Sequence, residues 1–263
     1  MKNIKNFLIP FTLTAGALLI SFNTYGDSNI YHLSTQAPEY THEKPDFAAM
    51  PVKEKKETFI KLALIGINSA NNEICAERKE VKDIQKSLDK NKKINNKQEK
   101  RLNTFAEYYK VDYQNLSSEQ VIQKLLIRID TAPQSFVLAQ AILESGWGTS
   151  RFATEYNNYF GLHCFEDGCG AKAEKADVYM EIFRTPGDSI LGYYYRLNTG
   201  GAFEDFRQVR AKTNGKSNQV DDLLNTLSNY SELSGDEYKQ RLLSVIDYNN
   251  LRQYDTPTCG NTH

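Results

Sequence analysis

An eleven-residue segment, Gln140-Ala-Ile-Leu-Glu-Ser-Gly-Trp-Gly-Thr-Ser150, places a single carboxylate at the end of an apolar helix. Residues 136–143 are apolar on nearly every side, a pattern that predicts a buried core helix. The two polar residues of this helix, Gln140 and Glu144, are four positions apart and therefore share one face. We expect Gly146 to end the helix just beyond the carboxylate.

The position of Glu144 predicts a glutamic acid that can still donate a proton near neutral pH. The last turn of a helix lies at the negative end of its dipole, and the neighbouring residues are apolar. Both effects disfavour the ionised carboxylate. We therefore interpret Glu144 as a general acid. The alternative is a solvated surface residue, which is the commoner role of a glutamate at a helix end.

The elements that must position Glu144 are mainly helical. Thr131 and Gln134 have the spacing of a capping box before the central helix. Apolar residues recur at helical spacing over residues 52–93. Further helices are expected at 97–109, 118–129, 189–198, 220–227 and 236–248.

A small β element is expected beside the proposed acid. Residues 156–175 are rich in glycine and asparagine and predict a loop, whereas Val178 to Phe183 alternates as a strand does. Lys172 to Asp177 is the candidate hairpin partner. The predicted fold class is therefore mainly α with a small β-hairpin (α+β).

Composition and the N-terminus indicate an exported protein. The net charge of −1 and the pI near 6.5 give no case for nucleic-acid binding. Residues 1–26 resemble a secretory signal, with Lys2 and Lys5 before an apolar run. An uncleaved anchor is the alternative. Cleavage would remove two lysines and no acid, which makes the charge about −3, and would leave no stable membrane span. We expect residues 27–117 to form an irregular N-terminus and helical extension, and residues 118–263 to form the catalytic domain.

The four cysteines are consistent with an oxidising compartment. Cys164 and Cys169 bracket four residues, a short loop that a local disulfide could close. Cys75 and Cys259 would then pair with each other or stay free. A metal site at Cys164, Cys169 and His163 is the weaker interpretation, because the spacing is not that of a zinc knuckle.

Three segments carry a resemblance to a known family. Residues 139–148, 150–153 and 157–161 resemble the bacterial cell-wall N-acetylglucosaminidases of the flagellar-muramidase type, glycoside hydrolase family 73. Residues 164–169, which follow Phe-Gly-Leu-His, resemble more specifically the Bax-type proteins of Gram-negative bacteria. The resemblance is strongest over residues 118–210.

The resemblance implies a lysozyme-like, two-lobed fold with a helical N-terminal extension. It also implies periplasmic hydrolysis of the β-1,4 bond after N-acetylglucosamine in peptidoglycan, with Glu144 as the catalytic acid. No metal or organic cofactor is expected. A lytic transglycosylase or muramidase, which would cut after N-acetylmuramic acid, and a non-catalytic peptidoglycan-binding protein are the competing hypotheses.

A second carboxylate is expected in the hairpin region, because glycosidases commonly use two. Glu174 is the first choice by its position. The other candidates there are Glu166, Asp167, Asp177 and Glu181. The region has no clear Thr-Glu-Tyr-type motif, so the substrate's N-acetyl group could instead act as the nucleophile.

Five residues are candidates for contact with sugar. Tyr193 matches a tyrosine of the family, and Trp147 follows the acid by three residues. Asn157 and Asn158 could hydrogen-bond N-acetyl groups, and Gln140 shares the face of the acid. Each has a structural alternative: a buried tyrosine or glutamine, a tryptophan packed beneath the helix, or asparagines that stabilise a turn.

Overall fold

The computed structural model describes residues 44–164, 169–173, 177–214, 216, 218–227, 235–256 and 259. The predicted signal, residues 1–26, lies outside them. The helices are α1 Val52–Asn91, α2 Asn96–Tyr108, α3 Ser118–Arg128, α4 Gln134–Ser145, α5 Arg151–Tyr156, α6 Pro186–Thr199, α7 Glu204–Thr213, α8 Gln219–Leu224 and α9 Gly235–Tyr248. The strands are β1 His163–Cys164, β2 Ala171–Lys172 and β3 Tyr179–Met180.

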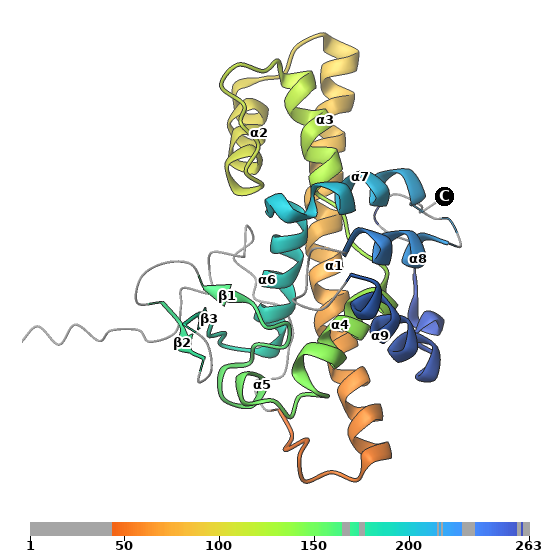
Figure 1. Ribbon diagram of the computed structural model, residues 1–263. Helices are drawn as coiled ribbons and strands as arrows, with labels where there is room; N and C mark the ends of the chain where they lie inside the picture. The colour runs from red at the N-terminus through yellow and green to blue at the C-terminus, as the bar shows by residue number, and fades with distance from the viewer. Residues whose placement is uncertain are drawn as a thin grey trace, which may run out of the picture.

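Helix α1 is the spine of the molecule (Figure 1). Its 40 residues make a rod about 60 Å long. One stripe of its surface is buried in the hydrophobic core that it shares with the other helices. This stripe includes Phe59, Ala63, Ile67 and Ile74. The stripe packs on α6, α3 and α4. The helix predicted for residues 52–93 is therefore confirmed as one continuous element.

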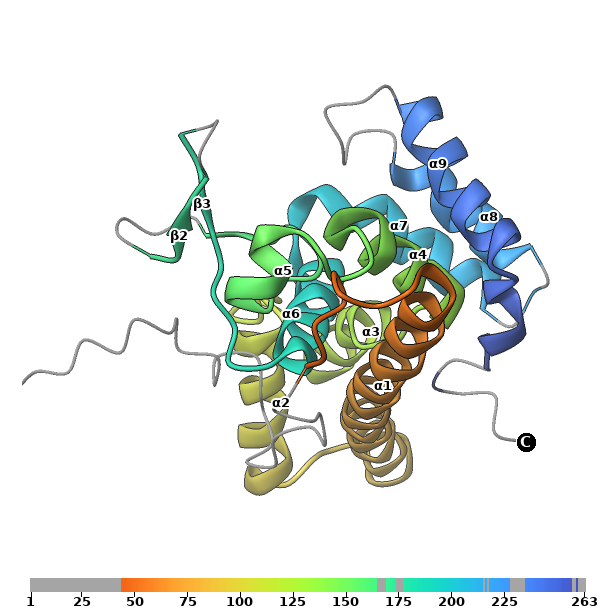
Figure 2. The same cartoon turned by 90° about the horizontal axis from the view of Figure 1, so that it is seen from below.

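Helix α4 is buried at the centre of the fold. Residues 134–142 are all buried, as its apolar sequence predicts. It packs against α9 on one side and α1 on the other. In Figure 2, α4 lies between α1, α5 and α9. The helix is thus held on several sides before its last turn reaches Glu144.

A three-stranded antiparallel sheet lies beside the helical body (Figures 1 and 2). Strand β3 is central: Met180 pairs with His163 of β1 and with Ala171 of β2. Strand β3 lies within the expected Val178 to Phe183 and pairs with β2, as predicted, but β2 shares only Lys172 with the expected partner Lys172 to Asp177, of which residues 174–176 lie outside the described residues. Strand β1 was not predicted, because it has only two residues in a glycine- and asparagine-rich region. The expected class, mainly α with a small β element, is confirmed.

The predicted capping box at the start of α4 is wrong. Pro133 occupies the cap position and no side chain there caps the helix. The carboxylate of Asp255, 120 residues further on, accepts from the backbone N–H of Ser135 at 2.7 Å and from its hydroxyl at 2.8 Å. The side-chain Oε1 of Gln134 accepts from the backbone N–H of Thr256 at 2.7 Å. The helix is capped from the C-terminal segment, which local sequence spacing does not reveal.

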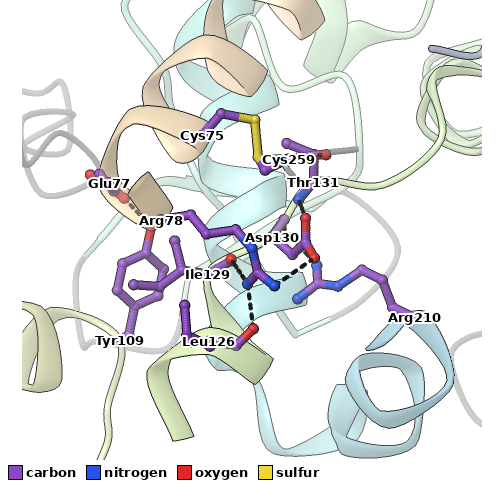
Figure 3. Close-up of a disulfide and its surroundings, with 10 residues drawn as sticks. All are labelled: Cys75, Glu77, Arg78, Tyr109, Leu126, Ile129, Asp130, Thr131, Arg210 and Cys259. Carbon is purple, nitrogen blue, oxygen red and sulfur yellow. Dashed lines mark hydrogen bonds and ion pairs between the residues drawn. A yellow bond between two sulfur atoms is a disulfide. The ribbon is translucent and has the colours of Figure 1, made fainter. Parts of the chain in front are cut away.

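A disulfide joins α1 to the same C-terminal segment. Cys75 and Cys259 are bonded, with their Cα atoms 5.0 Å apart (Figure 3). Beside the bond, Arg78 donates to the carbonyl of Ile129 at 2.7 Å, and the buried Arg210 donates to the carbonyl of Asp130 at 2.9 Å. Arginines therefore satisfy the carbonyls at the end of α3, where positive charge is favoured.

The described part of the chain contains no helix that combines the length and the apolarity needed to cross a membrane.

Candidate active site

Glu144 lies in the last turn of α4, and Gly146 ends that helix in the left-handed conformation with φ 57°. The side chain is partly buried. Burial raises the pKa of the Glu144 carboxyl above its ordinary value, and a hydrogen bond from Tyr238 opposes this rise. The sequence argument for a carboxyl that stays protonated at a higher pH than usual therefore has a structural counterpart.

The turn after Glu144 is unusually tight. Gly146, Trp147 and Gly148 all have positive φ, with values of 57°, 61° and 76°. A Cβ at Gly148 would lie 2.6 Å from the ring of Phe47, so no larger residue fits without displacement. The Gly148 N–H donates to the Ser145 hydroxyl at 2.9 Å. This turn fixes the end of the helix that carries the acid.

A chain of hydrogen bonds holds the Glu144 side chain. The hydroxyl of Tyr238 donates to Glu144 Oε1 at 2.7 Å. Gln140 donates from Nε2 to the Tyr238 hydroxyl at 3.1 Å, and its Oε1 accepts from the Tyr193 hydroxyl. Three helices, α4, α6 and α9, meet in this network. Oε1 is thereby oriented, and Oε2 remains on the opposite side of the carboxyl.

Oε2 of Glu144 faces the loop that contains Gly161. A Cβ added to Gly161, whose φ is 61°, would be 3.8 Å from this oxygen. Asn158 shapes the loop: its Oδ1 accepts from the Leu162 N–H at 2.9 Å, and its Nδ2 donates to the carbonyls of Leu162 and Glu181 at 2.9 and 3.0 Å. Asn158 thus ties the loop to the residue after β3 and brings Gly161 to the acid.

Asn157 fixes the other side of this loop. It caps α5 in the left-handed conformation with φ 54°. Its Nδ2 donates to the carbonyls of Phe183 and Arg184 at 2.9 and 3.0 Å, and its Oδ1 accepts from Lys44 at 2.7 Å. The amides of Asn157 and Asn158 are thus both engaged within the protein.

The structure brings Gln140, Tyr193 and the loop of Asn158 to Glu144, and Trp147 lies in the turn that follows it, whereas the contacts of Asn157 are with Lys44, Phe183 and Arg184; most of the five are buried. Tyr193 and Gln140 have no exposed surface and Asn158 is 1% exposed. Tyr193 stacks on Phe160 with ring centres 4.2 Å apart. Trp147 is half-buried and packs edge-on against the Phe59 ring of α1. These contacts fit residues that position the acid.

The candidates for a second carboxylate are divided by the structure. Glu166, Asp167 and Glu174 lie outside the described residues. Asp177 is exposed and pairs with Lys172 at 2.9 Å, a contact that lowers its pKa. Glu181 is largely buried and pairs with Arg196.

A metal centre at the predicted cysteines is ruled out by their bonding. Cys164 and Cys169 form a disulfide, as predicted, with Cα atoms 6.1 Å apart. Within the described ranges, no three His, Cys, Asp or Glu side chains gather closely enough to hold a metal ion.

Sequence reasoning missed Tyr238. It lies 94 residues after Glu144 in a helix whose apolar periodicity makes it look like a core residue, and it is indeed 2% exposed. Only the packing of α9 on α4 brings its hydroxyl to the acid. A tyrosine in a buried stripe carries a polar group that needs a partner, and this was the one available signal.

Comparison with known proteins gives three findings. The profile of the glucosaminidase family, described as mannosyl-glycoprotein endo-beta-N-acetylglucosaminidase, matches residues 119–251. Protein bax of Escherichia coli (strain K12) is 30% identical over 208 residues, which cover 78% of this chain and 74% of that protein. The catalytic domain of the autolysin Auto from Listeria monocytogenes matches 81% of this chain and 100% of its own, at 17% identity and a TM-score of 0.37.

Proposed function

The chain belongs to the glucosaminidase family of glycoside hydrolases, whose substrate class is peptidoglycan glycan, and we propose that it cleaves the β-1,4 bond after N-acetylglucosamine. Glu144 is the general acid in this proposal. The observation that carries it is the Glu144 carboxyl itself: partly buried, with a raised pKa, and oriented through one oxygen by Tyr238.

The geometry suggests how the proton is delivered. Oε1 accepts the hydrogen bond from Tyr238, so the acidic proton resides on Oε2, which faces Gly161. The glycosidic oxygen of the bound strand receives this proton as its bond to the sugar breaks. The absence of a Cβ at Gly161 keeps the space beside Oε2 open. Tyr238, Gln140 and Tyr193 act as positioning residues behind the acid.

Glu174 is the proposed second carboxylate. Asp177 and Glu181, the described acids of the β region, are held in ion pairs with Lys172 and Arg196. A paired carboxylate is a poorer nucleophile or base, because its charge is already stabilised by the cation. These pairings leave Glu166, Asp167 and Glu174 as candidates, and the sequence ranked Glu174 first.

We propose that residues 118–263 carry the catalysis and that α1 braces them. The core residues Phe59 and Ile67 of α1 are fully buried in the same hydrophobic cluster as α4. The proposed location is the periplasm, reached by means of the signal at residues 1–26. Peptidoglycan lies outside the cytoplasmic membrane, and the Escherichia coli relative comes from a Gram-negative bacterium.

The test is a digest of purified peptidoglycan by the wild type, by Glu144→Gln and by the matched control Glu155→Gln. Glu155 is an exposed glutamate on α5 that pairs with Arg151. Products are reduced with borohydride and identified by mass spectrometry. We expect fragments that end in reduced N-acetylglucosamine from the wild type and the control, and none from Glu144→Gln. Muramic or anhydromuramic ends would assign a muramidase or lytic transglycosylase instead. No fragments from folded protein would assign a binding protein.

The second carboxylate is tested by Glu174→Gln in the same digest. A loss of at least about 100-fold in kcat is expected if Glu174 acts on the reacting bond. Unchanged turnover would transfer this role to the N-acetyl group of the substrate.

A further inference from the structure

A groove of about 590 Å³ runs along the N-terminal half of α1 and the end of α9. This volume is in the range of ligand pockets. Lys53, Lys56 and Lys61 line its rim, and Ile60 and Leu64 contribute apolar surface. We refer to it as the lysine groove. Its α1 wall lies outside residues 119–251, the segment that matches the family profile.

The groove is positively charged. Glu57 is the acidic residue among those that line it. Its contact with Lys53 is 4.0 Å long, between side chains that are 68% and 90% exposed, and so neutralises little charge. Three lysines therefore face one weakly paired carboxylate across a partly apolar surface.

Lys56 links the groove to the turn after the acid. Its Nζ lies 4.9 Å from the centre of the Trp147 ring and 4.7 Å from that of Tyr248, and it donates to Asn249 Oδ1 at 3.2 Å. Two rings and an amide thus hold this ammonium in place, although the Tyr248 residue itself is 82% exposed. Trp147 is three residues from Glu144, so the groove adjoins the turn that ends the catalytic helix.

We propose that the lysine groove binds the acidic stem peptide of the peptidoglycan strand whose glycan is cleaved at Glu144. The inference rests on the proposed function for its substrate. A stem peptide carries several carboxylates and small apolar side chains, which match a cationic rim and an apolar floor. Neutral N-acetylglucosamine offers no charge for three lysines, and N-acetylmuramic acid without its peptide offers a single lactyl carboxylate. The groove therefore selects strands that still carry their peptides.

The direct test is calorimetric binding of the stem tetrapeptide, released from peptidoglycan by an amidase, to the Glu144→Gln protein. In that background, Lys53→Gln/Lys56→Gln/Lys61→Gln should weaken binding about tenfold, since each exposed ion pair contributes modestly. The matched control is Lys90→Gln/Lys93→Gln/Lys97→Gln, which makes the same charge change at exposed positions at the far end of α1 and the start of α2. Added salt should weaken binding to the unsubstituted groove.

Three results would overturn the proposal: no binding of the peptide, equal binding by the groove and control variants, or an equal loss of affinity for peptide-free glycan. The last would make the groove a glycan site. If the groove substitutions instead change the oligomeric state in sedimentation, the occupant is a second copy of the chain. Lys53→Gln/Lys61→Gln, which spares the half-buried Lys56, should still weaken binding severalfold if Lys56 proves necessary for folding.

A kinetic experiment separates this inference from the proposed function. With wild-type catalytic residues, the triple groove variant should raise KM about tenfold on peptide-bearing strands and leave kcat unchanged. On peptide-free strands, which keep only the lactyl carboxylates, the rise in KM should be much smaller. Hydrolysis without peptide binding would refute only the proposal that the groove binds the stem peptide. Peptide binding without hydrolysis of either substrate would refute only the proposed hydrolase function.

Discussion

Glu77 should make the stability of this protein depend on pH. The side chain is 7% exposed on α1 and accepts a hydrogen bond from the Tyr109 hydroxyl (Figure 3). Burial raises the Glu77 pKa from 4.5 to about 7, against the opposing effect of the Tyr109 hydrogen bond. Glu73, Glu80 and Arg101 supply smaller contributions. The carboxyl is thus protonated in the folded protein under conditions where the unfolded chain ionises it.

The direction of the pH dependence follows from the difference between the Glu77 pKa in the folded and in the unfolded chain. An acid whose pKa is raised by folding stabilises the folded state fully below the unfolded pKa, and this stability is lost as the pH rises through the folded pKa. For Glu77 the window runs from about 4.5 to about 7. At 1.36 kcal/mol per pKa unit, the loss amounts to about 3 kcal/mol. Such a loss is a substantial part of the stability of a typical domain.

Glu77→Gln removes the titration and keeps an acceptor for Tyr109. We compare urea unfolding of the oxidised wild type and variant at pH 4.5 and pH 8. The stability of the variant relative to the wild type should be higher at pH 8 than at pH 4.5. We expect its free energy of unfolding, minus that of the wild type, to rise by about 3 kcal/mol between the two pH values. Other titrating groups cancel in this difference.

Tyr109→Phe is the companion variant. It removes the hydrogen bond that lowers the Glu77 pKa, so the pH window in which stability is lost should extend to higher pH. Stability curves for wild type and Glu77→Gln that run parallel from pH 4.5 to 8 would refute the reasoning, because they would mean that Glu77 has the same pKa in the folded and unfolded chains.

Three further perturbations follow from the contacts. Tyr238→Phe should raise the pKa of Glu144, because it removes the hydrogen bond that lowers this pKa. In the pH profile of kcat, the decrease at high pH should therefore move to higher pH. An unmoved decrease would show that Tyr238 does not lower the Glu144 pKa. Asp255→Ala should lower the free energy of unfolding by about 2 kcal/mol in denaturant titrations, since it removes the cap of α4; a change below about 0.5 kcal/mol would contradict the cap. Cys75→Ser/Cys259→Ser should lower the free energy of unfolding by about 2–4 kcal/mol, because the disulfide links residues 184 positions apart. Unchanged thermal unfolding would contradict this prediction.

Local patterns predicted the elements well where one period dominated. The apolar run of residues 136–143 gave α4 and its burial, and the position of Gly146 gave its end. The stripe from Phe59 to Ile84 gave α1 over nearly its full length. In each case packing and periodicity favour the same structure, so the sequence alone was sufficient.

The failures share a cause, which is partners far apart in the sequence. The spacing of Thr131 and Gln134 suggested a local cap, but Asp255 supplies it from across the chain. Tyr238 reaches Glu144 only because α9 crosses α4. Asn158 was a candidate for hydrogen bonds to the N-acetyl groups of the substrate, with a turn as the alternative, and in the structure its amide bonds to the backbone of the loop and of Glu181. Spacing in one chain cannot show which distant group satisfies a buried polar atom.

The acid therefore depends on both flanks of the segment that matches the family. Residues 119–251 contain Glu144, Tyr238 and the loop of Gly161. They lack Asp255, which caps the start of α4, and they lack α1, against which α4 packs. A helix in its native place needs both its termini and its apolar face satisfied. The disulfide between α1 and Cys259 joins the two flanks to each other, so they support α4, the helix that carries the proposed acid, as one unit.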